Sequence, residues 1–387
     1  MRSILVAGGG TGGHVFPGLA VARALRDIAD VDIVFAGSPR GLESRIVPQY
    51  GYELELLDVE PMKGGGAGRA IKSALVAAKA MRHAAGLVSR IRPSAVLSVG
   101  GYAAGPAALA CVRQRVPLAI LEPNSVLGLA NRLLAPFAKR AYVAWSETAR
   151  VFRRDKARLY GVPLRPGFTP RSYMPKPGMR RVLVLGGSQG AQALNERVPG
   201  AVARLQGELG EVHVIHQTGS DDDAVAQAYA RAGVSTARTV TFLEDVAGEV
   251  AAADVVLARA GAVTVAEIAA IGRASILVPF PHAADDHQAK NAMALAEIGG
   301  SVCIRQEAAD EIRLARELAV LFSDDERRAR MAHAAREHGK PHAAEDIASD
   351  LLSLAGIATK RKIDHKKGKN GATNGASGHY PTSKEVS

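Results

Sequence analysis

The chain has 387 residues, of which 47% are apolar, and it carries a net charge of +11 at pH 7. This length predicts two domains of ordinary size with substantial cores. The two cysteines, Cys111 and Cys303, exclude a disulfide framework and a cysteine-based metal cluster, which favours a reducing compartment. No apolar run is long enough to span a membrane, and the first one is too short for a signal peptide. We therefore expect a soluble or peripheral protein.

Short apolar runs alternate with helical segments, which is typical of an α/β fold with parallel sheets. The runs predict strands at 3–7, 31–36, 95–99, 117–121, 181–185, 212–216, 238–242, 254–257 and 275–278. A proline-rich stretch over 163–178 predicts a linker. We expect an N-terminal domain over 1–162 and a C-terminal domain over 179–357, whose last helix packs back on the first. Both are predicted to be doubly wound, with ligands in a cleft at the strands' carboxyl ends.

The positive charge is concentrated in two segments. Residues 63–92 carry seven Lys or Arg and no acid, and residues 359–387 carry seven with two acids. The tail over 358–387 lacks hydrophobic periodicity and is rich in Gly, Ser and Asn, so it is predicted to be disordered. Either binding to an anionic surface or a solubilising role would explain it.

A helical wheel divides the basic segment 63–92 into two faces. The face predicted to pack on the domain holds Ala74, Ala77, Ala78, Met81, Ala84, Ala85, Val88 and Ile91. The opposite face holds Lys72, Lys79, His83 and Arg90, flanked by Leu75, Val76, Arg82 and Leu87. A basic face with exposed aliphatic side chains favours an anionic membrane surface, and a solvated face is the alternative. Nucleic acid is disfavoured by the 4% aromatic content and by the lack of a recognisable motif.

A glycine-rich loop, Gly8-Gly9-Gly10-Thr11-Gly12-Gly13-His14, follows the first strand. Its spacing matches the dinucleotide fingerprint, but the second strand ends Phe35-Ala36-Gly37-Ser38 without the acid that would hold a ribose. We therefore predict that the amides at the N-terminus of the following helix bind an anionic oxygen. The alternative is a glycine-rich turn that binds no ligand. His14 is a candidate for proton transfer or phosphate binding, unless a nearby carbonyl satisfies it.

Two further turns follow strands in the second half. The loop from Gly186 to Gly190 also precedes a helix and would expose its N-terminal amides, and Ser188 adds a hydroxyl donor. The two loops together predict a ligand that carries a diphosphate. In the turn over 258–272, Thr264 and Glu267 have the spacing of a capping box. The alternative is that the amides at 262–264 hold a phosphate while Glu267 accepts the hydroxyls of a ribose.

Acidic and histidine clusters elsewhere do not predict a metal. His282, Asp285, Asp286 and His287 match no standard zinc spacing, so a cleft wall or a helix cap is the better interpretation. Asp221–Asp223 suit a first helical turn, and the pair Asp30 and Asp32 opens a strand, the wrong end for a ligand. Glu122 follows a strand and is a second candidate proton acceptor, or else an acid at a helix N-terminus.

Several motifs together resemble the MurG family of bacterial glycosyltransferases: GGGTGGHVFPGLAVA, SVGGYAAGPAALAC, EPNSVLGLANRLLA, VLVLGGSQGAQALN and RAGAVTVAEIAAIGRASILVPFPHAADDHQAKNA. The resemblance covers about residues 3–355 and implies a GT-B fold. It also implies inverting transfer of N-acetylglucosamine from UDP-N-acetylglucosamine to the muramoyl C4 hydroxyl of lipid I, an undecaprenyl-diphosphate-linked acceptor, forming lipid II for peptidoglycan. The resemblance further implies that the reaction requires no metal or cofactor and that it takes place at the cytoplasmic face of the plasma membrane.

The resemblance also implies roles for individual residues. Thr11, Gly12 and Gly13 would contribute to the UDP-N-acetylglucosamine site, where they would lie beside the donor sugar and the acceptor diphosphate. The donor would be bound by Asn124, Arg165, Ser188 (phosphate), Leu243 (uracil), Ala262, Val263, Thr264, Val265, Ala266, Glu267 (ribose) and Gln288 (sugar hydroxyls). Where relatives often carry His and Gln, this chain has Leu121 and Pro123, so no role of those two side chains carries over and His14 or Glu122 is the expected base. The alternatives are a UDP-sugar transferase acting on another lipid, a UDP-N-acetylglucosamine 2-epimerase, and a non-catalytic nucleotide-sugar-binding protein.

Overall fold

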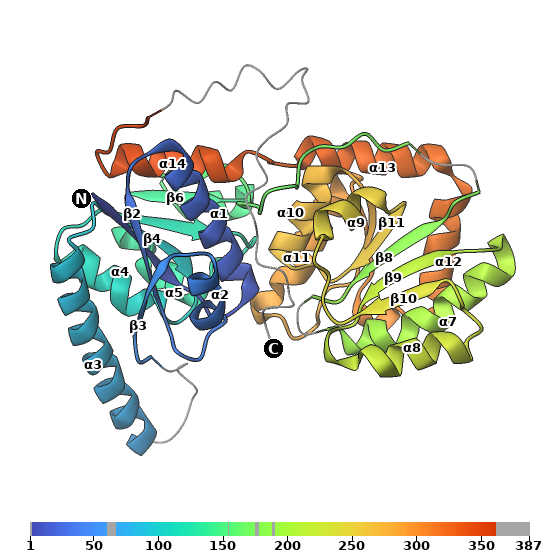
Figure 1. Ribbon diagram of the computed structural model, residues 1–387, viewed down its shortest axis with the longest axis horizontal. Coiled ribbons are helices and arrows are strands. Elements are labelled where there is room, and N and C mark those ends of the chain that lie inside the picture. The colour runs from blue at the N-terminus through green and yellow to red at the C-terminus, as the bar shows by residue number, and fades with distance from the viewer. Residues whose placement is uncertain (1, 60–66, 154, 175–177, 188–189, 361–387) are drawn as a thin grey trace. The chain divides into compact units, whose positions relative to one another are not determined.

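The computed structural model describes residues 2–59, 67–153, 155–174, 178–187 and 190–360, without the side chains of 67–75 and 77. These residues form two compact units (Figure 1). The first contains 2–122, 127–163 and 342–360, and the second contains 123–126 and 164–341. Among the described helices, none combines the length and the apolar composition that a membrane span requires.

The first unit is built around a seven-stranded sheet with the order β3-β2-β1-β4-β5-β6-β7. Every neighbouring pair is parallel. The strands are β1 (Ser3–Gly8), β2 (Asp32–Gly37), β3 (Glu53–Leu56), β4 (Ala95–Gly100), β5 (Leu118–Glu122), β6 (Arg140–Val143) and β7 (Ala157–Leu159). The chain order reverses between β1 and β4, and in such sheets this switch point is where ligands bind.

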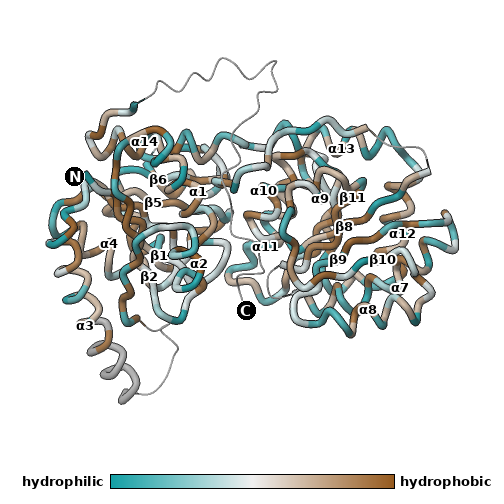
Figure 2. The backbone as a smooth tube through the Cα atoms, in the orientation of Figure 1, coloured by the Kyte–Doolittle hydropathy of each residue, from teal (hydrophilic) through white to brown (hydrophobic). Residues whose placement is uncertain are grey.

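Helices cover both faces of this sheet. They are α1 (Gly12–Ile28), α2 (Glu43–Gln49), α3 (Ala67–Ile91), α4 (Ala104–Arg113), α5 (Leu129–Leu134), η1 (Ala135–Phe137), α6 (Ser146–Ala149) and α14 (Ala343–Leu354). Along β1, Ile4 and Val6 join the core formed with α1 and α14, whereas Leu5 and Ala7 join the core formed with α3 and α4. Strands that pack on both faces appear in the sequence as uninterrupted apolar runs, and the tube is brown, meaning hydrophobic, along the central strands (Figure 2).

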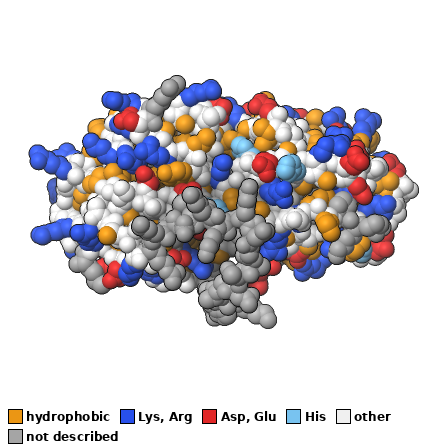
Figure 3. All heavy atoms as spheres, turned by 90° about the horizontal axis from the view of Figure 1, so that it is seen from above, with side chains coloured by type: hydrophobic (Ala, Val, Ile, Leu, Met, Phe, Trp, Pro, Cys, Tyr) orange, Lys and Arg blue, Asp and Glu red, His pale blue; other side chains and the backbone are white. Residues whose placement is uncertain are grey.

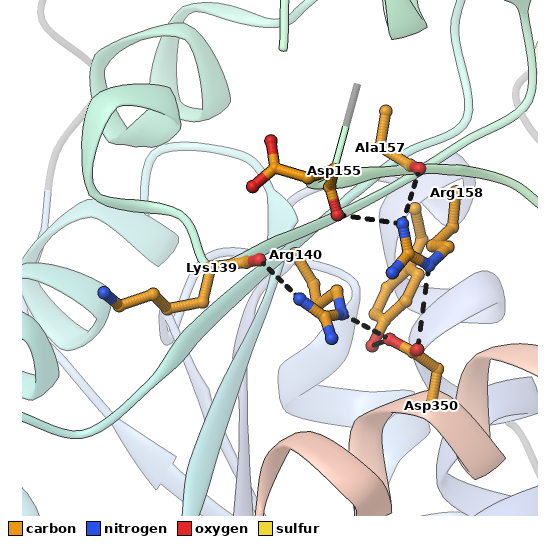
Figure 4. A network of polar contacts seen from close by, with 7 residues as sticks. Lys139, Arg140, Asp155, Ala157, Arg158 and Asp350 are labelled. Carbon is orange, nitrogen blue, oxygen red and sulfur yellow. Dashed lines mark hydrogen bonds and ion pairs between the residues drawn. The ribbon is translucent and has the colours of Figure 1, made fainter. Parts of the chain in front are cut away.

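The helix α14 belongs to the first unit although it follows the whole second unit in the chain. Its apolar face packs against α1. Asp350 on this helix accepts hydrogen bonds from Arg140 Nε at 3.1 Å and from the Tyr142 hydroxyl at 2.9 Å, and it lies 3.8 Å from Arg158 Nε (Figure 4). One carboxylate therefore joins the last helix to β6 and β7.

The second unit repeats the plan with a six-stranded parallel sheet in the order β10-β9-β8-β11-β12-β13. Its strands are β8 (Arg181–Leu185), β9 (His213–Gln217), β10 (Ala237–Val240), β11 (Val255–Ala258), β12 (Ala274–Leu277) and β13 (Val302–Cys303). Its helices are α7 (Gln192–Leu209), η2 (Gly219–Asp221), α8 (Asp222–Arg231), α9 (Val246–Ala252), α10 (Ala262–Ile271), η3 (Ala284–Asp286), α11 (His287–Glu297), η4 (Gln306–Ala308), α12 (Glu311–Ser323) and α13 (Asp325–His338). The switch point lies between β8 and β11.

Every strand predicted from the sequence overlaps a strand of the structure, and the doubly wound fold is confirmed. The sequence does not predict the strands β3, β6, β7 and β13, because their residues form no clear apolar run. The described residues of the predicted linker from Leu164 onward, 164–174 and 178, belong to the second unit. There the amide of Arg171 donates to Ile271 O at 3.0 Å and the Tyr173 hydroxyl donates to Asp254 at 3.0 Å.

The predicted packing face of the basic helix is partly wrong. Ala84 and Val88 are buried as expected, but Leu87, assigned to the exposed side, is also buried, and Ala78, assigned to the packed side, is exposed. The buried side chains of this helix include Ala80, Ala84, Leu87 and Val88. Relative to the predicted face, the buried face is rotated toward Leu87, because this large aliphatic side chain packs inward. The tail beyond residue 360 lies outside the described residues.

Candidate active site

The glycine-rich loop of the first unit lies at the switch point between β1 and β4. Gly8, Gly9 and Gly10 have φ angles of 132°, 153° and 97°, a region that side-chain-bearing residues avoid. A Cβ on Gly8 would lie 2.1 Å from the carbonyl oxygen of Gly100 at the end of β4. The loop therefore requires glycine both for its conformation and for its close approach to the neighbouring strand. The loop leads directly into α1, and the first amides of a helix have no acceptor within that helix.

His14 lies in the first turn of α1 and is partly exposed. Its Nδ1 is 3.4 Å from Thr11 Oγ1. A Cβ built on Gly100 would lie 3.2 Å from His14 Nε2 and 3.5 Å from Asn131 Nδ2. The imidazole and the Asn131 amide therefore both lie against the end of β4.

Glu122 ends β5 and is 2% exposed. Its Oε2 accepts hydrogen bonds from the amide of Gly128 at 2.9 Å and from Asn131 Nδ2 at 3.1 Å. Asn131 is itself held by Ser98 Oγ, which donates to Asn131 Oδ1 at 2.8 Å. Gly128 is the residue before α5, so the Glu122 carboxylate accepts from an amide at the N-terminus of that helix. This contact fits the alternative in which Glu122 is an acid at a helix N-terminus.

In the second unit the corresponding loop follows β8. Gly187 and Gly190 have φ angles of 82° and 73°, and a Cβ on Gly190 would lie 2.4 Å from the carbonyl oxygen of Thr218. The loop leads into α7, whose preceding residue, Ala191, provides no side-chain cap. Ser188, expected to hold a phosphate, lies outside the described residues.

The third turn excludes the capping-box interpretation of Thr264 and Glu267. The helix α10 begins at Ala262 after Gly261, so Thr264 lies inside the first turn and cannot be the N-terminal cap. Glu267 is instead 5% exposed and forms an ion pair with Arg165 Nη2 at 3.1 Å. The amides of Ala262, Val263 and Thr264 precede the first intrahelical bond, made by Val265 N, and are therefore the ones available to an anion.

Burial raises the pKa of Glu267, and the nearby charge of Arg165 opposes this shift. The ion pair with Arg165 therefore offsets part of the effect of burial on this carboxyl group. This arrangement places an acceptor group one helical turn behind three amide donors, a pattern suited to a phosphate with an attached ribose.

The other residues expected to bind the donor also belong to the second unit. Leu243 follows β10 and is 4% exposed, and Val265 and Ala266 lie within α10. Gln288 in α11 accepts a hydrogen bond from the amide of Phe280 at 3.0 Å. Asn124 lies in the segment 123–126, where the amide of Ser125 donates to Asn291 Oδ1 at 3.1 Å.

The polar segment before α11 contains no metal cluster. No group of three or more His, Cys, Asp or Glu side chains among the described residues is arranged to hold an ion. Asp286 forms an ion pair with Arg305 at 2.8 Å, and His287 Nδ1 lies 2.7 Å from the carbonyl oxygen of Ala284. As predicted, Asp222 and Asp223 lie in the first turn of α8, and Asp32 begins β2.

Of the five residues predicted to form the membrane face, Lys79 and Arg82 are exposed on α3 and Val76 is partly exposed. The side chains of Lys72 and Leu75 lie outside the described ones. The sequence interpretation missed a second group of exposed apolar side chains, Leu129, Leu133 and Phe137, which are 58%, 67% and 49% exposed. Their short segment, α5 and η1, has too few residues for a hydrophobic period to be recognised.

Comparisons with known proteins identify the family of this chain. The Glycosyltransferase family 28 N-terminal domain matches residues 4–143, and the family 28 C-terminal domain matches 181–347. A Sorangium cellulosum protein is 51% identical over 94% of this chain and 91% of its own length. It is named UDP-N-acetylglucosamine--N-acetylmuramyl-(pentapeptide) pyrophosphoryl-undecaprenol N-acetylglucosamine transferase. A protein of the same name from Anaeromyxobacter sp. is 41% identical over 91% of this chain and 92% of its own length.

Solved structures show the same architecture. MurG from Acinetobacter baumannii is 31% identical, with a TM-score of 0.76 over 91% of this chain and all of that structure. A UDP-GlcNAc 2-epimerase from Neisseria meningitidis is 11% identical with a TM-score of 0.64, covering 91% of this chain and all of that structure, and it shares the fold alone. The fold and both domain models thus define a glycosyltransferase of the GT-B type. Within that class, the chain belongs to glycosyltransferase family 28, alongside the MurG enzymes that it resembles.

Proposed function

We propose that this protein transfers N-acetylglucosamine from UDP-N-acetylglucosamine to the C4 hydroxyl of the muramoyl residue of lipid I, which forms lipid II. The observation that carries the proposal is the pair of glycine-rich loops at the switch points of two Rossmann-like sheets, in a chain 51% identical to a relative named for this reaction. Anomeric inversion by direct displacement is the mechanism that needs only these groups. UDP leaves as the acceptor oxygen attacks.

The donor is held by the second unit in this proposal. The first-turn amides of α10, at Ala262, Val263 and Thr264, bind phosphate oxygens, and Glu267 accepts the ribose hydroxyls. Arg165 supports this role because its guanidinium keeps a positive charge beside the buried Glu267 carboxyl group. Helix N-terminal amides also stabilise the charge that develops on the departing diphosphate.

The acceptor is held by the first unit, and His14 takes its proton. A general base must touch the group that it deprotonates. His14 is partly exposed in the first turn after the glycine-rich loop, whereas Glu122 is 2% exposed and its Oε2 already receives two hydrogen bonds. Glu122 then positions the start of α5 and the Asn131 amide.

Two variants test this assignment. His14→Ala should lower kcat by about 10²–10⁴-fold, the usual contribution of a general base, with little change in thermal stability. Glu122→Ala should lower thermal stability and reduce kcat less, since it leaves the Gly128 amide and the Asn131 side chain without the oxygen that accepts from both. Near-normal turnover by the His14 variant at saturating substrates would contradict the assignment.

The protein binds an anionic membrane surface through its first unit, and this places it as a peripheral protein at the cytoplasmic face. Support comes from the basic, acid-free segment 63–92 and from the exposed apolar side chains of Leu129, Leu133 and Phe137. The face drawn in Figure 3 carries basic, acidic and apolar side chains intermixed. What distinguishes segment 63–92 is its lack of acids.

Charge reversal tests the membrane surface. The double variant Lys79→Glu/Arg82→Glu should weaken binding to vesicles containing anionic lipid and leave turnover of a soluble acceptor intact. The matched control is Arg330→Glu in the second unit, whose side chain is 67% exposed. Equal vesicle binding by wild type and the double variant would remove the membrane role of α3.

A further inference from the structure

A buried carboxyl group lies beneath the glycine-rich loop of the first unit. Glu43, the first residue of α2, is 1% exposed. Its Oε2 accepts a hydrogen bond from the amide of Gly10 at 2.6 Å, and its Oε1 accepts one from the amide of Ser38 at 2.8 Å. One side chain therefore joins the loop after β1 to the loop after β2.

Three glycines make room for this carboxyl group. A Cβ on Gly9 or Gly41 would lie 2.2 Å or 2.1 Å from an atom of the carboxyl group, and one on Gly37 would lie 2.4 Å from Glu43 Cγ. Gly37 and Gly41 do not have the positive φ that favours glycine. At these two positions it is therefore the contact with Glu43 that requires glycine.

Backbone hydrogen bonds also hold the glycine-rich loop in place. The amide of Gly9 donates to the carbonyl oxygen of Gly100 at 3.2 Å, and the amide of Leu42 donates to that of Gly10 at 3.4 Å. Two consecutive residues, Gly9 and Gly10, are thus held between β4 and the segment around Glu43. The amides that follow belong to Thr11, the residue before α1, and to Gly12 and Gly13, which begin the helix and precede His14.

We propose that Glu43 is a positioning residue, which fixes the glycine-rich loop so that the first amides of α1 and His14 meet the acceptor diphosphate and hydroxyl. The proposal rests on the function proposed above. Glu43 itself contacts backbone rather than substrate. Both oxygens are needed because each accepts one backbone N–H, whereas a glutamine offers one oxygen and turns an NH₂ donor toward the other amide.

The variant Glu43→Gln separates positioning from stability. We expect kcat/KM for a short-chain lipid I analogue to fall by about 100-fold, as for a small displacement of reacting groups. The KM for UDP-N-acetylglucosamine should stay within about twofold, because the second unit holds the nucleotide. The control is Asp254→Asn, since Asp254 is 6% exposed and accepts from Arg181 N at 2.9 Å and the Tyr173 hydroxyl at 3.0 Å. This control should lower thermal stability without the selective loss.

A second variant covers the case in which Glu43→Gln does not fold. Gly41→Ala displaces the Glu43 carboxyl group without removing it and should also lower kcat/KM for the lipid I analogue. The control is Gly207→Ala, where a Cβ has no atom within 4 Å, and it should leave kcat/KM unchanged. Equal kcat/KM for wild type and the folded Glu43→Gln or Gly41→Ala variant overturns the inference.

Hydrogen exchange keeps this inference distinct from the proposed function. If the wild type makes no lipid product, the proposed function fails, and the exchange rates of the amides over 10–15 decide the role of Glu43. Faster exchange there in Glu43→Gln, but not in Asp254→Asn, supports positioning. Unchanged exchange rejects it.

Discussion

At the scale of single residues, the ion pair between Arg165 and Glu267 makes the stability of the protein depend on pH. Glu267 is buried, and burial raises its pKa above the ordinary value of 4.5 while Arg165 opposes the shift. An acid with a raised pKa in the folded state binds more protons when folded than when unfolded. Stability therefore falls as pH rises above that ordinary value, and Arg165 limits the fall.

The variant Arg165→Met should thus be destabilised in a pH-dependent way. We expect its thermal unfolding temperature to approach that of the wild type near pH 4.5 and to fall increasingly below it toward pH 8. Removing one partner of a buried pair costs about 3 kcal/mol when the other is left charged. Unfolding temperatures measured across this pH range give the result.

The matched control is Arg238→Met. Arg238 pairs with Glu249 at 2.8 Å, but its side chain is 59% exposed, so water replaces the lost partner. A pH-independent difference for Arg165→Met, similar to that of the control, would contradict the dependence of Glu267 on Arg165.

At the scale of elements, α14 illustrates how one side chain attaches a helix that is distant in sequence. Asp350 receives hydrogen bonds from Arg140 and Tyr142. Burial, followed by the charge of Asp350, raises the pKa of Tyr142, so its hydroxyl stays protonated and donates. Loss of this acceptor leaves the polar groups of β6 and β7 without their shared partner.

Asp350→Ala should destabilise the first unit by about 2 kcal/mol, less than a fully buried pair because the Arg side chains are about one-third exposed. For a unit of this size, the expected fall in unfolding temperature is roughly 5 °C. Calorimetry measures it. Glu326→Gln on α13, with a side chain 88% exposed, is the control, and a similar small effect for both variants would exclude a stabilising role for Asp350.

The sequence predicts long buried strands and glycine-rich turns well, because their signals are local. Uninterrupted apolar runs identify β1 and β8, and the glycines that follow them are required by backbone conformation. Contacts between distant residues are not visible in such patterns. Glu267 has the spacing of a capping box, yet its partner Arg165 lies 102 residues away. Glu43 carries no periodic signal, and only the structure reveals the three glycines around it.

At the scale of the whole molecule, the candidate residues divide between two units of the same design. Thr11, Gly12, Gly13, His14 and Glu122 belong to the first unit, and the described residues expected to bind the nucleotide belong to the second. A duplicated plan with a switch point in each sheet allows donor and acceptor to be bound by separate loops.

Hydrogen exchange of the full chain should reveal this division. UDP alone should slow exchange over 259–268, where α10 begins, and leave the amides over 10–15 unchanged. A short-chain acceptor analogue should do the reverse. The division of labour is wrong if UDP protects only the first unit, and inorganic phosphate serves as the control for unspecific anion binding.

The proposed reaction of the whole protein is sugar transfer to a lipid-linked muramoyl acceptor. The direct measurement incubates the protein with labelled UDP-N-acetylglucosamine and a short-chain lipid I analogue, with the same mixture lacking acceptor as the control. We expect a labelled lipid product with a β-1,4 linkage, formed together with one UDP per sugar. No labelled lipid would contradict it, whether the protein only bound the nucleotide sugar or acted on another acceptor.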